Sequence, residues 1–409
     1  MISVLVSHPH AGAIANATAA ALERQGKLAL YVTGVAGGPS SPSGTALGWA
    51  AAKNAVWKNR ILEGVDPVRL RSLAAVEVGT RLLGGMAGRV SRRFPSVYDL
   101  VYLVHDRAVA TIPWPRAADT VYTYEDCALR TFQRARRRRM RTVLDVASPY
   151  YRALEGRWRD ECRRWPDAMD TPPHLEPDWK GCRKDGELKD ADLVSVASSH
   201  TRSSLEGAPV RRAPAVVPYG FPVDLFPPKE GAPSGPFTVL AVGSQTMRKG
   251  THCLLMAWKR AGLRDARLKL IGPLALGRAF LDQHAGIFEH VEHLPRTALG
   301  AEYRNSDLVA FPTLGDGFGL VIQEGMCSGT PVVTTPSGGG PECITHGVDG
   351  WIVPAGDIDA LVETLRYCAA NRDQVRRVGQ AARARAERWT WREAGQALIK
   401  VLEEHQGLS

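Results

Sequence analysis

The sequence has no apolar run that approaches the roughly 20 residues needed to span a bilayer. Its seven cysteines include no C-x-x-C pair, so neither a zinc site nor a disulfide framework is indicated. The G-x-G-x-x-G fingerprint of dinucleotide-binding domains is also absent. The amino terminus lacks the basic start of a signal peptide. We therefore expect a cytoplasmic protein that meets a membrane, if at all, peripherally at its inner face.

Acidic side chains are too few to balance the basic ones in one half of the chain. Residues 1–218 hold 32 Lys and Arg against 22 Asp and Glu, whereas residues 219–409 hold 20 of each. The net charge of +10 therefore comes entirely from the N-terminal half. This asymmetry favours an anionic partner there, such as a membrane surface or an acidic acceptor. A basic but simply solvated surface is the alternative.

An arginine run closes a helix predicted over residues 126–139. It consists of Arg134, Arg136, Arg137, Arg138 and Arg139. Cations suit the negative end of a helix dipole, which is the simpler explanation. Contact with anionic lipid, worth about 1 kcal/mol per basic residue, is the alternative. No aromatic residues are interleaved with the run, so nucleic acid is not an expected partner.

The length of 409 residues predicts two domains. Strands alternate with helices in both halves, which predicts an α/β protein with two Rossmann-like domains of parallel strands. A Pro- and Gly-rich stretch without periodicity separates the halves. We expect an N-terminal domain at 1–218, a linker at 219–235, a C-terminal domain at 236–390, and a final helix at 391–409 that can cross back to the first domain.

In the first half, the expected strand at 2–6 runs into a turn that carries His8 and His10, followed by an Ala-rich helix and a strand at 28–33. Open α/β sheets place their ligand crevice at such turns, so both histidines are candidate ligand or acceptor contacts; ordinary loop histidines are the alternative. Further strands are expected at 120–124 and 142–146. Residues 34–97 give a poor pattern of loops and helices, with a set of basic residues: Lys53, Lys58, Arg60, Arg89, Arg92 and Arg93.

Two aspartate pairs have the spacing of metal ligands, Asp190 with Asp192 and Asp357 with Asp359. The first falls at a helix-to-strand junction, and the second is typical of a helix N-cap. We therefore expect no metal site.

Three glycine-containing turns in the second half follow expected strands and should meet at the carboxyl edge of the sheet: 243–250, 315–324 and 337–342. Arg248 and Lys249 precede a helix, an arrangement that suits a diphosphate. The glycines at 338–340 let backbone N–H groups approach oxyanions. Glu324 lies in an apolar helix, where a hydroxyl ligand such as ribose would offset its burial.

These segments resemble the retaining, nucleotide-sugar-dependent glycosyltransferases of the GT-B fold, glycosyltransferase family 4 (glycosyl transferases group 1). The chain reads FPTLGDGFGLVIQEGMCSGTPVV, then SGGGPECITHGVDGWIVP, then GDIDAL, which matches the family pattern over about 50 residues. The turn GSQTMRKG resembles the family's diphosphate-binding turn, and VVPYGFPVDLF resembles its interdomain linker. The resemblance implies two Rossmann-like domains that face each other across a cleft.

The resemblance also implies roles for individual residues. Arg248 and Lys249 would hold the donor diphosphate, with Gly243 and Ser244 in the same turn. Glu324 would bind the ribose hydroxyls, and Asp316 takes the place of the first Glu of the family motif. The remaining donor contacts are Phe318, Gly319 and Leu320, which would use their backbone, together with Gly339 and Glu342.

The chain departs from the family pattern at four points. Asp316 is one methylene shorter than the usual Glu. Ser244 stands near a position that is commonly Arg. The N-terminal glycine pair is reduced to Gly12. The loop after the strand at 142–146, which often carries a His, reads Ala147-Ser148-Pro149. Ser148 and Gly12 are therefore assigned to the acceptor side, together with His8 and His10.

The implied activity is transfer of a sugar from a nucleoside-diphosphate sugar to the hydroxyl of an acceptor (a glycan, a lipid-linked molecule or a small molecule), with retention of configuration and without metal or other cofactor. Two alternatives remain open at this point. One is a degenerate protein that binds nucleotide or glycan without turnover. The other is a different GT-B enzyme, such as a phosphorylase or a sugar-nucleotide epimerase.

Overall fold

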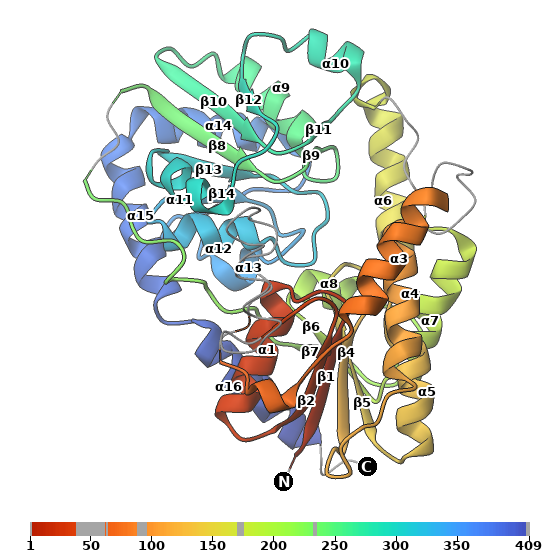
Figure 1. The fold of residues 1–409 in the computed structure, drawn as a ribbon. Helices are drawn as coiled ribbons and strands as arrows, with labels where there is room; N and C mark the ends of the chain where they lie inside the picture. The colour runs from red at the N-terminus through yellow and green to blue at the C-terminus, as the bar shows by residue number, and fades with distance from the viewer. Residues whose placement is uncertain are drawn as a thin grey trace.

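A computed structural model describes residues 2–37, 62, 64–87, 96–169, 176–231 and 235–405. Two α/β domains face each other in Figure 1, and the chain crosses between them through the linker and again before its last helix. The expected α/β class with two Rossmann-like domains is confirmed. The basic residues Lys53, Lys58, Arg60, Arg89, Arg92 and Arg93 lie outside the described residues.

The N-terminal domain is built on a parallel sheet of seven strands. In spatial order they are β3 (Leu70–Ser72), β2 (Leu28–Thr33), β1 (Val4–His8), β4 (Thr120–Tyr124), β5 (Arg141–Val146), β6 (Leu193–Val196) and β7 (Ala215–Val216). Successive residues of β1 alternate between faces: Val4 and Val6 pack into one core and Leu5 into the other. The sheet is thus covered on both sides, which explains its nearly continuous apolar strands.

Helices form the outer layers of this domain. They are α1 (Ala13–Arg24), α3 (Ala74–Ala87), α4 (Val97–Val109), α5 (Leu129–Arg137), α6 (Tyr151–Arg164), α7 (Asp178–Asp190) and α8 (Ser199–Ser204), with short 3-10 turns η2 (Pro67–Arg69) and η3 (Pro166–Ala168). Residues of α1 share a core with Val4 and Val6, and residues of α4, α5 and α7 share the core on the Leu5 side.

The C-terminal domain repeats the three-layer plan with six parallel strands. In spatial order they are β12 (Glu289–Val291), β10 (Ala266–Ile271), β8 (Phe237–Val242), β13 (Leu308–Phe311), β14 (Val332–Thr334) and β15 (Trp351–Ile352). A separate pair joins β9 (Gln245–Thr246) and β11 (Leu274–Ala275). The helices are α9 (Thr251–Ala261), α10 (Arg278–Asp282), α11 (Arg296–Arg304), α12 (Leu320–Cys327), α13 (Gly340–Cys343), α14 (Ile358–Ala370) and α15 (Arg372–Ala386).

Local sequence determines many of these boundaries. Glycines in the left-handed conformation flank α9 at Gly250 and Gly262. The side chain of Asp357 caps α14 by accepting from Ala360 N at 3.0 Å, so this aspartate is the N-cap that the sequence predicts. The strands predicted at 28–33 and 120–124 are observed at those residues.

Three local expectations were wrong in detail. His8 is the last residue of β1, not part of the turn, because the strand begins and ends later than predicted. The helix expected at 126–139 is shorter, because Asp126 and Arg139 adopt left-handed conformations at φ 71° and 56°. The glycine loop at 337–342 is partly helical, since Gly340 and Glu342 belong to α13.

The last helix, α16 (Trp391–Glu404), packs on the N-terminal domain. Leu398, Ile399 and Leu402 join the core beside α1. A capping box at its start, formed by Thr390 and Glu393, satisfies the first N–H groups of the helix. Figure 1 shows α16 in blue beside α1 in red, which are opposite ends of the chain.

A contact in the other direction is made by α6 and η3. Ala168 is fully buried in the core of the C-terminal domain, and its carbonyl accepts from Gly277 N at 2.8 Å. Each domain therefore contributes residues to the other, which holds the two sheets in a defined relation.

The docking of α16 makes a testable prediction about two helical glycines. A methyl group on Gly395 would lie 2.3 Å from Ala21 Cβ of α1, whereas one on Gly156 of α6 would meet nothing within 4 Å. Gly395→Ala should therefore lower stability by about 1–3 kcal/mol through overpacking. Gly156→Ala should raise it by about 0.5–1 kcal/mol through helix propensity. Urea unfolding of both variants measures the difference, and shifts of the same sign would contradict this docking.

Candidate active site between the two domains

The carboxyl ends of the two parallel sheets face each other, and a cavity of about 410 Å³ lies between them. The N-terminal domain lines it with residues of α6 and the loop after β5, including Ser148, Arg157 and Trp158. The C-terminal domain contributes Arg248, Leu314 and Gly315. A cavity of this size, formed at strand ends between domains, is the usual place for a small-molecule site.

The turn at 243–250 is held against the loop after β13. Gly250 has φ 74°, and a Cβ there would lie 1.9 Å from Pro312 O, so only glycine fits. The carbonyl of Arg248 accepts from Leu314 N at 2.9 Å. This packing places Lys249 beside Asp316, and Lys249 Nζ forms a short ion pair with the Asp316 carboxylate. Two of the candidate charged groups of the C-terminal domain are thus brought together.

The remaining residues of this turn lie around that pair. Arg248 donates from Nη1 to Gly315 O at 3.2 Å and lines the cavity. Gly243 adopts φ 110°, and Ser244 is exposed. The Asp316 carboxylate also accepts from Gly317 N at 2.8 Å, and the Asp316 N–H donates to Ser337 O at 2.9 Å. The turns at 315–324 and 337–342 therefore both hold Asp316 in position.

Glu324 lies on α12, half-buried, and accepts a hydrogen bond from Tyr303 Oη at 2.8 Å. Gly319 precedes the helix in the left-handed conformation, with φ 92°. Phe318 buries its ring against Tyr219 of the linker. The expected backbone contacts at Phe318, Gly319 and Leu320 therefore lie at the start of the helix that carries Glu324.

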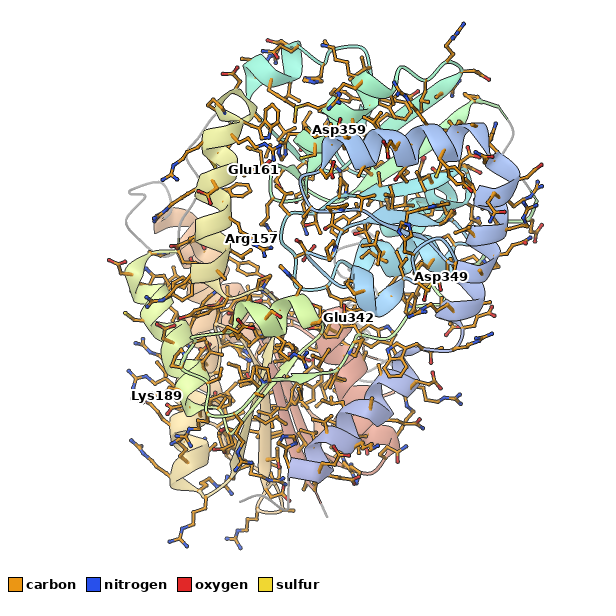
Figure 2. The ribbon with its side chains drawn as sticks, turned by 180° about the vertical axis from the view of Figure 1, so that it is seen from behind. Arg157, Glu161, Lys189, Glu342, Asp349 and Asp359 are labelled. Atoms are coloured by element: carbon orange, nitrogen blue, oxygen red, sulfur yellow. The ribbon has the colours of Figure 1, made fainter. Side chains whose placement is uncertain are left out.

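Gly339 and Glu342 have partners that the sequence did not reveal. Gly339 N donates to Phe318 O at 2.7 Å, so this N–H is occupied within the domain. Glu342 accepts from the backbone N–H of Ser199, in the other domain, at 2.7 Å. Its second carboxylate oxygen is buried and has no hydrogen-bond partner among the described residues. Glu342 thus joins the domains at the cleft, as Figure 2 shows beside α8.

Gly317 makes a close contact between the domains. Its carbonyl accepts from the hydroxyls of Ser198 at 2.6 Å and Thr201 at 3.0 Å. A Cβ at this position would lie 1.7 Å from Ala147 O, in the loop after β5. The glycine of the GFG segment therefore allows the two loops to meet.

The acceptor-side candidates divide into two places. Ser148 lines the cavity. His8 and His10 lie at the end of β1, where the ring of His8 is 4.8 Å from that of Tyr124 and the ring of His10 is 5.2 Å from that of Tyr98. Glu77 Oε1 lies 3.3 Å from His10 Nδ1. Gly12 is the N-cap of α1 in this region.

Two further residues of the N-terminal domain, Arg157 and His200, lie near the charged groups of the cleft and gave no signal in the sequence. Arg157 on α6 donates to Ser337 Oγ at 3.4 Å, across the domain boundary. Figure 2 shows Arg157 and Glu161 on the side of α6 toward the C-terminal domain. His200 on α8 has a buried Nε2 without a hydrogen-bond partner among the described residues. Burial and the Arg157 charge lower the pKa of His200 to about 4, partly offset by Asp316, so its imidazole is neutral at pH 7.

One group of possible metal ligands occurs in the part of the chain that the structure describes: Glu161, His252 and Cys253, with ligand atoms within 4.8 Å of one another. His252 Nε2 and Glu161 Oε1 are already 2.7 Å apart and form a bond between α6 and α9. Burial raises the pKa of the Cys253 thiol to about 12, which disfavours the thiolate that binds metals best. The group is therefore best described as an interdomain contact. The pairs Asp190 with Asp192 and Asp357 with Asp359 form no such group.

The fold is that of the GT-B glycosyltransferases. Over its full length the chain aligns with the structure of sucrose-phosphate synthase from Thermosynechococcus elongatus, with a TM-score of 0.68 and 15% identity over 100% of both chains. Anabaena HepE in complex with UDP-glucose aligns with a TM-score of 0.63 and 16% identity, over 99% of this chain and 100% of that one.

The C-terminal domain also matches a family model. Residues 223–385 match the family described as "Glycosyl transferases group 1", as the motifs indicated. The chain is also 29% identical over 238 residues to a GDP-mannose-dependent alpha-(1-6)-phosphatidylinositol monomannoside mannosyltransferase of Mycolicibacterium smegmatis. That alignment covers 52% of this chain and 62% of the mannosyltransferase, so this chain spans less than two thirds of the relative's length.

The contact at Gly317 predicts how the cleft closes. Gly317→Ala should prevent the loops from meeting, because its methyl group would overlap Ala147 O. The radius of gyration in solution should increase, while the unfolding temperature changes little, because neither core is altered. Gly315→Ala is the control, since its methyl group would meet only the movable end of Leu154 at 2.7 Å. Small-angle X-ray scattering that gives the same radius for both variants would contradict the closed contact.

Proposed function

We propose that the protein is a retaining glycosyltransferase that moves a sugar from a nucleoside-diphosphate sugar to an acceptor hydroxyl. One observation carries the proposal: the Lys249–Asp316 pair, Arg248 and the cavity lie together at the carboxyl edge of a sheet within the segment that matches a glycosyltransferase family model. The mannosyltransferase of M. smegmatis, which by its name uses GDP-mannose, supports a nucleoside-diphosphate donor. The UDP-glucose complex of the Anabaena protein supports the same class of donor.

In this proposal Lys249 and Arg248 bind the donor diphosphate. The diphosphate replaces Asp316 as the partner of Lys249, which frees the Asp316 carboxylate to accept hydrogen bonds from the donor sugar. Glu324 binds the ribose hydroxyls, with Tyr303 holding one of its oxygens at 2.8 Å. Backbone groups at 318–320 line the sugar site.

Transfer proceeds on one face of the sugar. The bond between the anomeric carbon and the diphosphate oxygen breaks, the acceptor oxygen bonds to the same face, and the acceptor proton moves to the departing diphosphate. Charge develops on the leaving group, so the cations of Arg248 and Lys249 stabilise the transition state more than the ground state. The side chains assigned here supply that charge without a metal ion.

The N-terminal domain supplies the acceptor side. Many relatives carry a functional histidine in the loop where this chain has Ala147 and Ser148. We assign that role to His200, because the neutral imidazole of His200 interacts electrostatically with both Arg157 and Asp316. Ser148 lines the cavity. His8, His10 and Gly12 form the outer part of the acceptor site beside the tyrosines of α4 and β4.

The acceptor itself is proposed to be anionic or presented at an anionic membrane surface, from the charge excess of the N-terminal half. None of the described helices is long and apolar enough to cross a bilayer. Any membrane contact is therefore proposed to be peripheral.

A second candidate, binding without turnover, is favoured by one observation. Asp316 is engaged by Lys249 and by Gly317 N, so the residue that departs from the family motif is not free in this arrangement. Donor binding without transfer to any acceptor of a native lipid or glycan extract would select this candidate.

Removal of the proposed donor contacts should abolish most activity. Lys249→Ala should lower kcat by about 10²–10³-fold, the usual cost of losing one group that stabilises developing charge. Glu324→Ala should mainly raise the donor KM, because ribose binding is equal in ground and transition states. Lys259→Ala is the matched control, because Lys259 lies on α9, the helix that follows Lys249, and its ammonium group donates to Gln283 O. Turnover of radiolabelled nucleotide sugars measures all three, and unchanged kinetics for Lys249→Ala would reject the assignment.

The configuration of the product tests retention, and the effect of chelators and divalent ions on the rate tests metal independence. Proton NMR of the purified product should show the anomeric configuration of the donor sugar. Transfer in excess EDTA should equal transfer with added Mg²⁺ or Mn²⁺, because Lys249 and Arg248 neutralise the diphosphate. An inverted product, or activity restored only by a divalent ion, would be incompatible with the proposed mechanism.

A further inference from the structure

A second cavity, of about 470 Å³, lies at the opposite edge of the N-terminal sheet from the cleft. Its lining includes the first residues of β4, β5 and β6, together with the end of α5, the 211–212 loop and the end of α16. No role proposed above involves this cavity.

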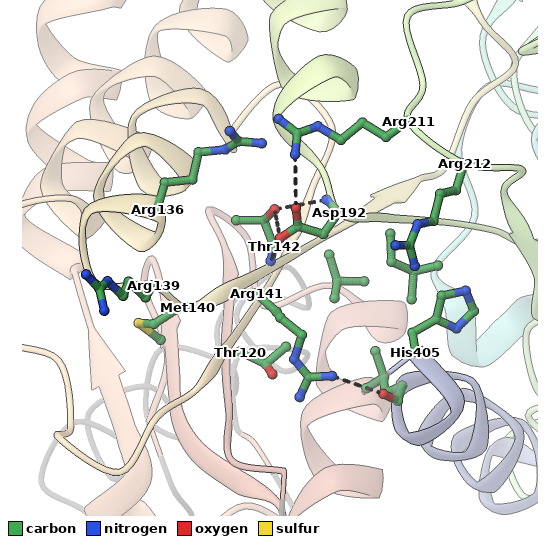
Figure 3. Close-up of a pocket in the computed structure, with 13 residues that line it drawn as sticks. Thr120, Arg136, Arg139, Met140, Arg141, Thr142, Asp192, Arg211, Arg212 and His405 are labelled. Carbon is green, nitrogen blue, oxygen red and sulfur yellow. Dashed lines mark hydrogen bonds and ion pairs between the residues drawn. The ribbon is translucent and has the colours of Figure 1, made fainter. Parts of the chain in front are cut away.

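The cavity is strongly basic. Five of its lining residues are arginines: Arg136, Arg139, Arg141, Arg211 and Arg212. Figure 3 shows these five arranged around it, with His405 at the end of α16. Among the described residues that line it, Asp192 is the only carboxylate. An excess of charge of one sign in a concave site raises the local concentration of counter-ions.

The carboxylate of Asp192 is already satisfied. It accepts from Thr142 N and Thr142 Oγ1, each at 3.0 Å, and from Arg211 Nη1 at 3.3 Å. It can therefore balance at most part of the arginine charge.

Three of the arginines donate to backbone carbonyls, which orient a guanidinium group, and each also lies within 3.8 Å of a carboxylate. Arg136 donates to Asp190 O at 3.1 Å, Arg141 to Leu402 O at 3.4 Å, and Arg211 to Lys189 O at 2.8 Å. Asp190 and Asp119 lie farther from Arg136 and Arg141, at 3.6 and 3.8 Å. Each guanidinium group has five N–H donors, so the groups held in this way keep further donors that can bind an oxyanion in a bidentate manner.

Arg139 stands at a position that usually favours glycine. It follows α5 with φ 56°, and its N–H donates to Arg136 O at 3.0 Å in the closing turn. Its guanidinium forms no hydrogen bond or ion pair within the described ranges of the chain. A strained conformation kept for a side chain without an internal partner is typical of a functional position.

We propose that this arginine pocket binds an anion with two or more phosphate groups. A cavity of about 470 Å³ lies within the range of small-molecule sites, about 300–1,000 Å³, and exceeds what a single phosphate fills. Five guanidinium groups line the pocket, and three of them pair with a carboxylate: Arg136 with Asp190, Arg141 with Asp119 and Arg211 with Asp192. The lining is therefore basic on balance, which matches a multiply charged phosphate compound. Such a ligand would be either a soluble phosphorylated molecule or the headgroup of a phosphorylated lipid.

Inorganic tripolyphosphate is a suitable probe, measured by calorimetry at low salt. The proposed diphosphate site in the cleft can take the same probe, so binding is measured in the Lys249→Ala background, where one saturable event should remain. Arg139→Gly should weaken binding by about tenfold or more, since hydrogen bonds to charged groups are among the strongest in proteins. Glycine is also favoured at φ 56°, so this variant should unfold at the same or a higher temperature, which separates loss of binding from loss of fold.

Arg137→Ala is the matched control, because Arg137 belongs to the same arginine run but does not line the pocket. It should leave the affinity within about twofold. Equal weakening by Arg137→Ala and Arg139→Gly would show a diffuse basic surface and overturn the proposal, as would the absence of saturable binding. Binding lost in Lys249→Ala but kept in Arg139→Gly would place the anion in the cleft and also overturn it.

Vesicles distinguish the two sources of the ligand. The protein should float with vesicles of phosphatidylcholine and phosphatidic acid if the ligand is a lipid headgroup. In that case Arg139→Gly should abolish flotation, and added tripolyphosphate should compete with the vesicles for the protein. Tripolyphosphate binding without flotation would assign a soluble phosphate compound. Either result supports the pocket.

Discussion

The carbonyl oxygen of Gly317 is the point on which the two-domain arrangement depends. It accepts two hydroxyl hydrogen bonds from the N-terminal domain, and the missing side chain lets Ala147 come into contact. The same loop carries Asp316, and its neighbours lead into the helix of Glu324. Closure of the cleft and the position of the charged groups are therefore one structural event, because a shift of this loop moves both.

The cleft is held at further points on either side of that contact. Glu342 binds the backbone of Ser199, His252 meets Glu161, and Gly277 binds the carbonyl of Ala168. The bonds themselves are polar, but apolar side chains also cross the boundary: Ala168 packs in the core of the C-terminal domain, and Ala197 shares a core cluster with Phe318. The polar contacts at Glu342 and His252 separate and re-form more readily than such cores, which suits a cleft that must admit a ligand and exclude water during a reaction.

Much of the C-terminal domain could be predicted from sequence, because its signals are local. Gly250 and Gly262 mark both ends of α9, and Asp357 marks the start of α14. The pairing of Lys249 with Asp316 could not be predicted, since the residues lie 67 positions apart and meet only through the packing of two loops. Arg157 and His200 were missed for the same reason: the placement of α6 and α8 against the other domain is a tertiary effect. The end of β1 lies two residues later than predicted, at His8 and not at Val6, so His8 belongs to the strand and not to the expected turn.

The account rests on the claim that a nucleoside diphosphate displaces Asp316 from Lys249. A crystal structure of the protein with a bound nucleotide sugar tests it most directly. We expect diphosphate oxygens within hydrogen-bonding distance of Lys249 Nζ, the ribose hydroxyls on Glu324, and Asp316 turned toward the sugar. An intact Lys249–Asp316 pair, with the nucleotide bound elsewhere, would contradict the account.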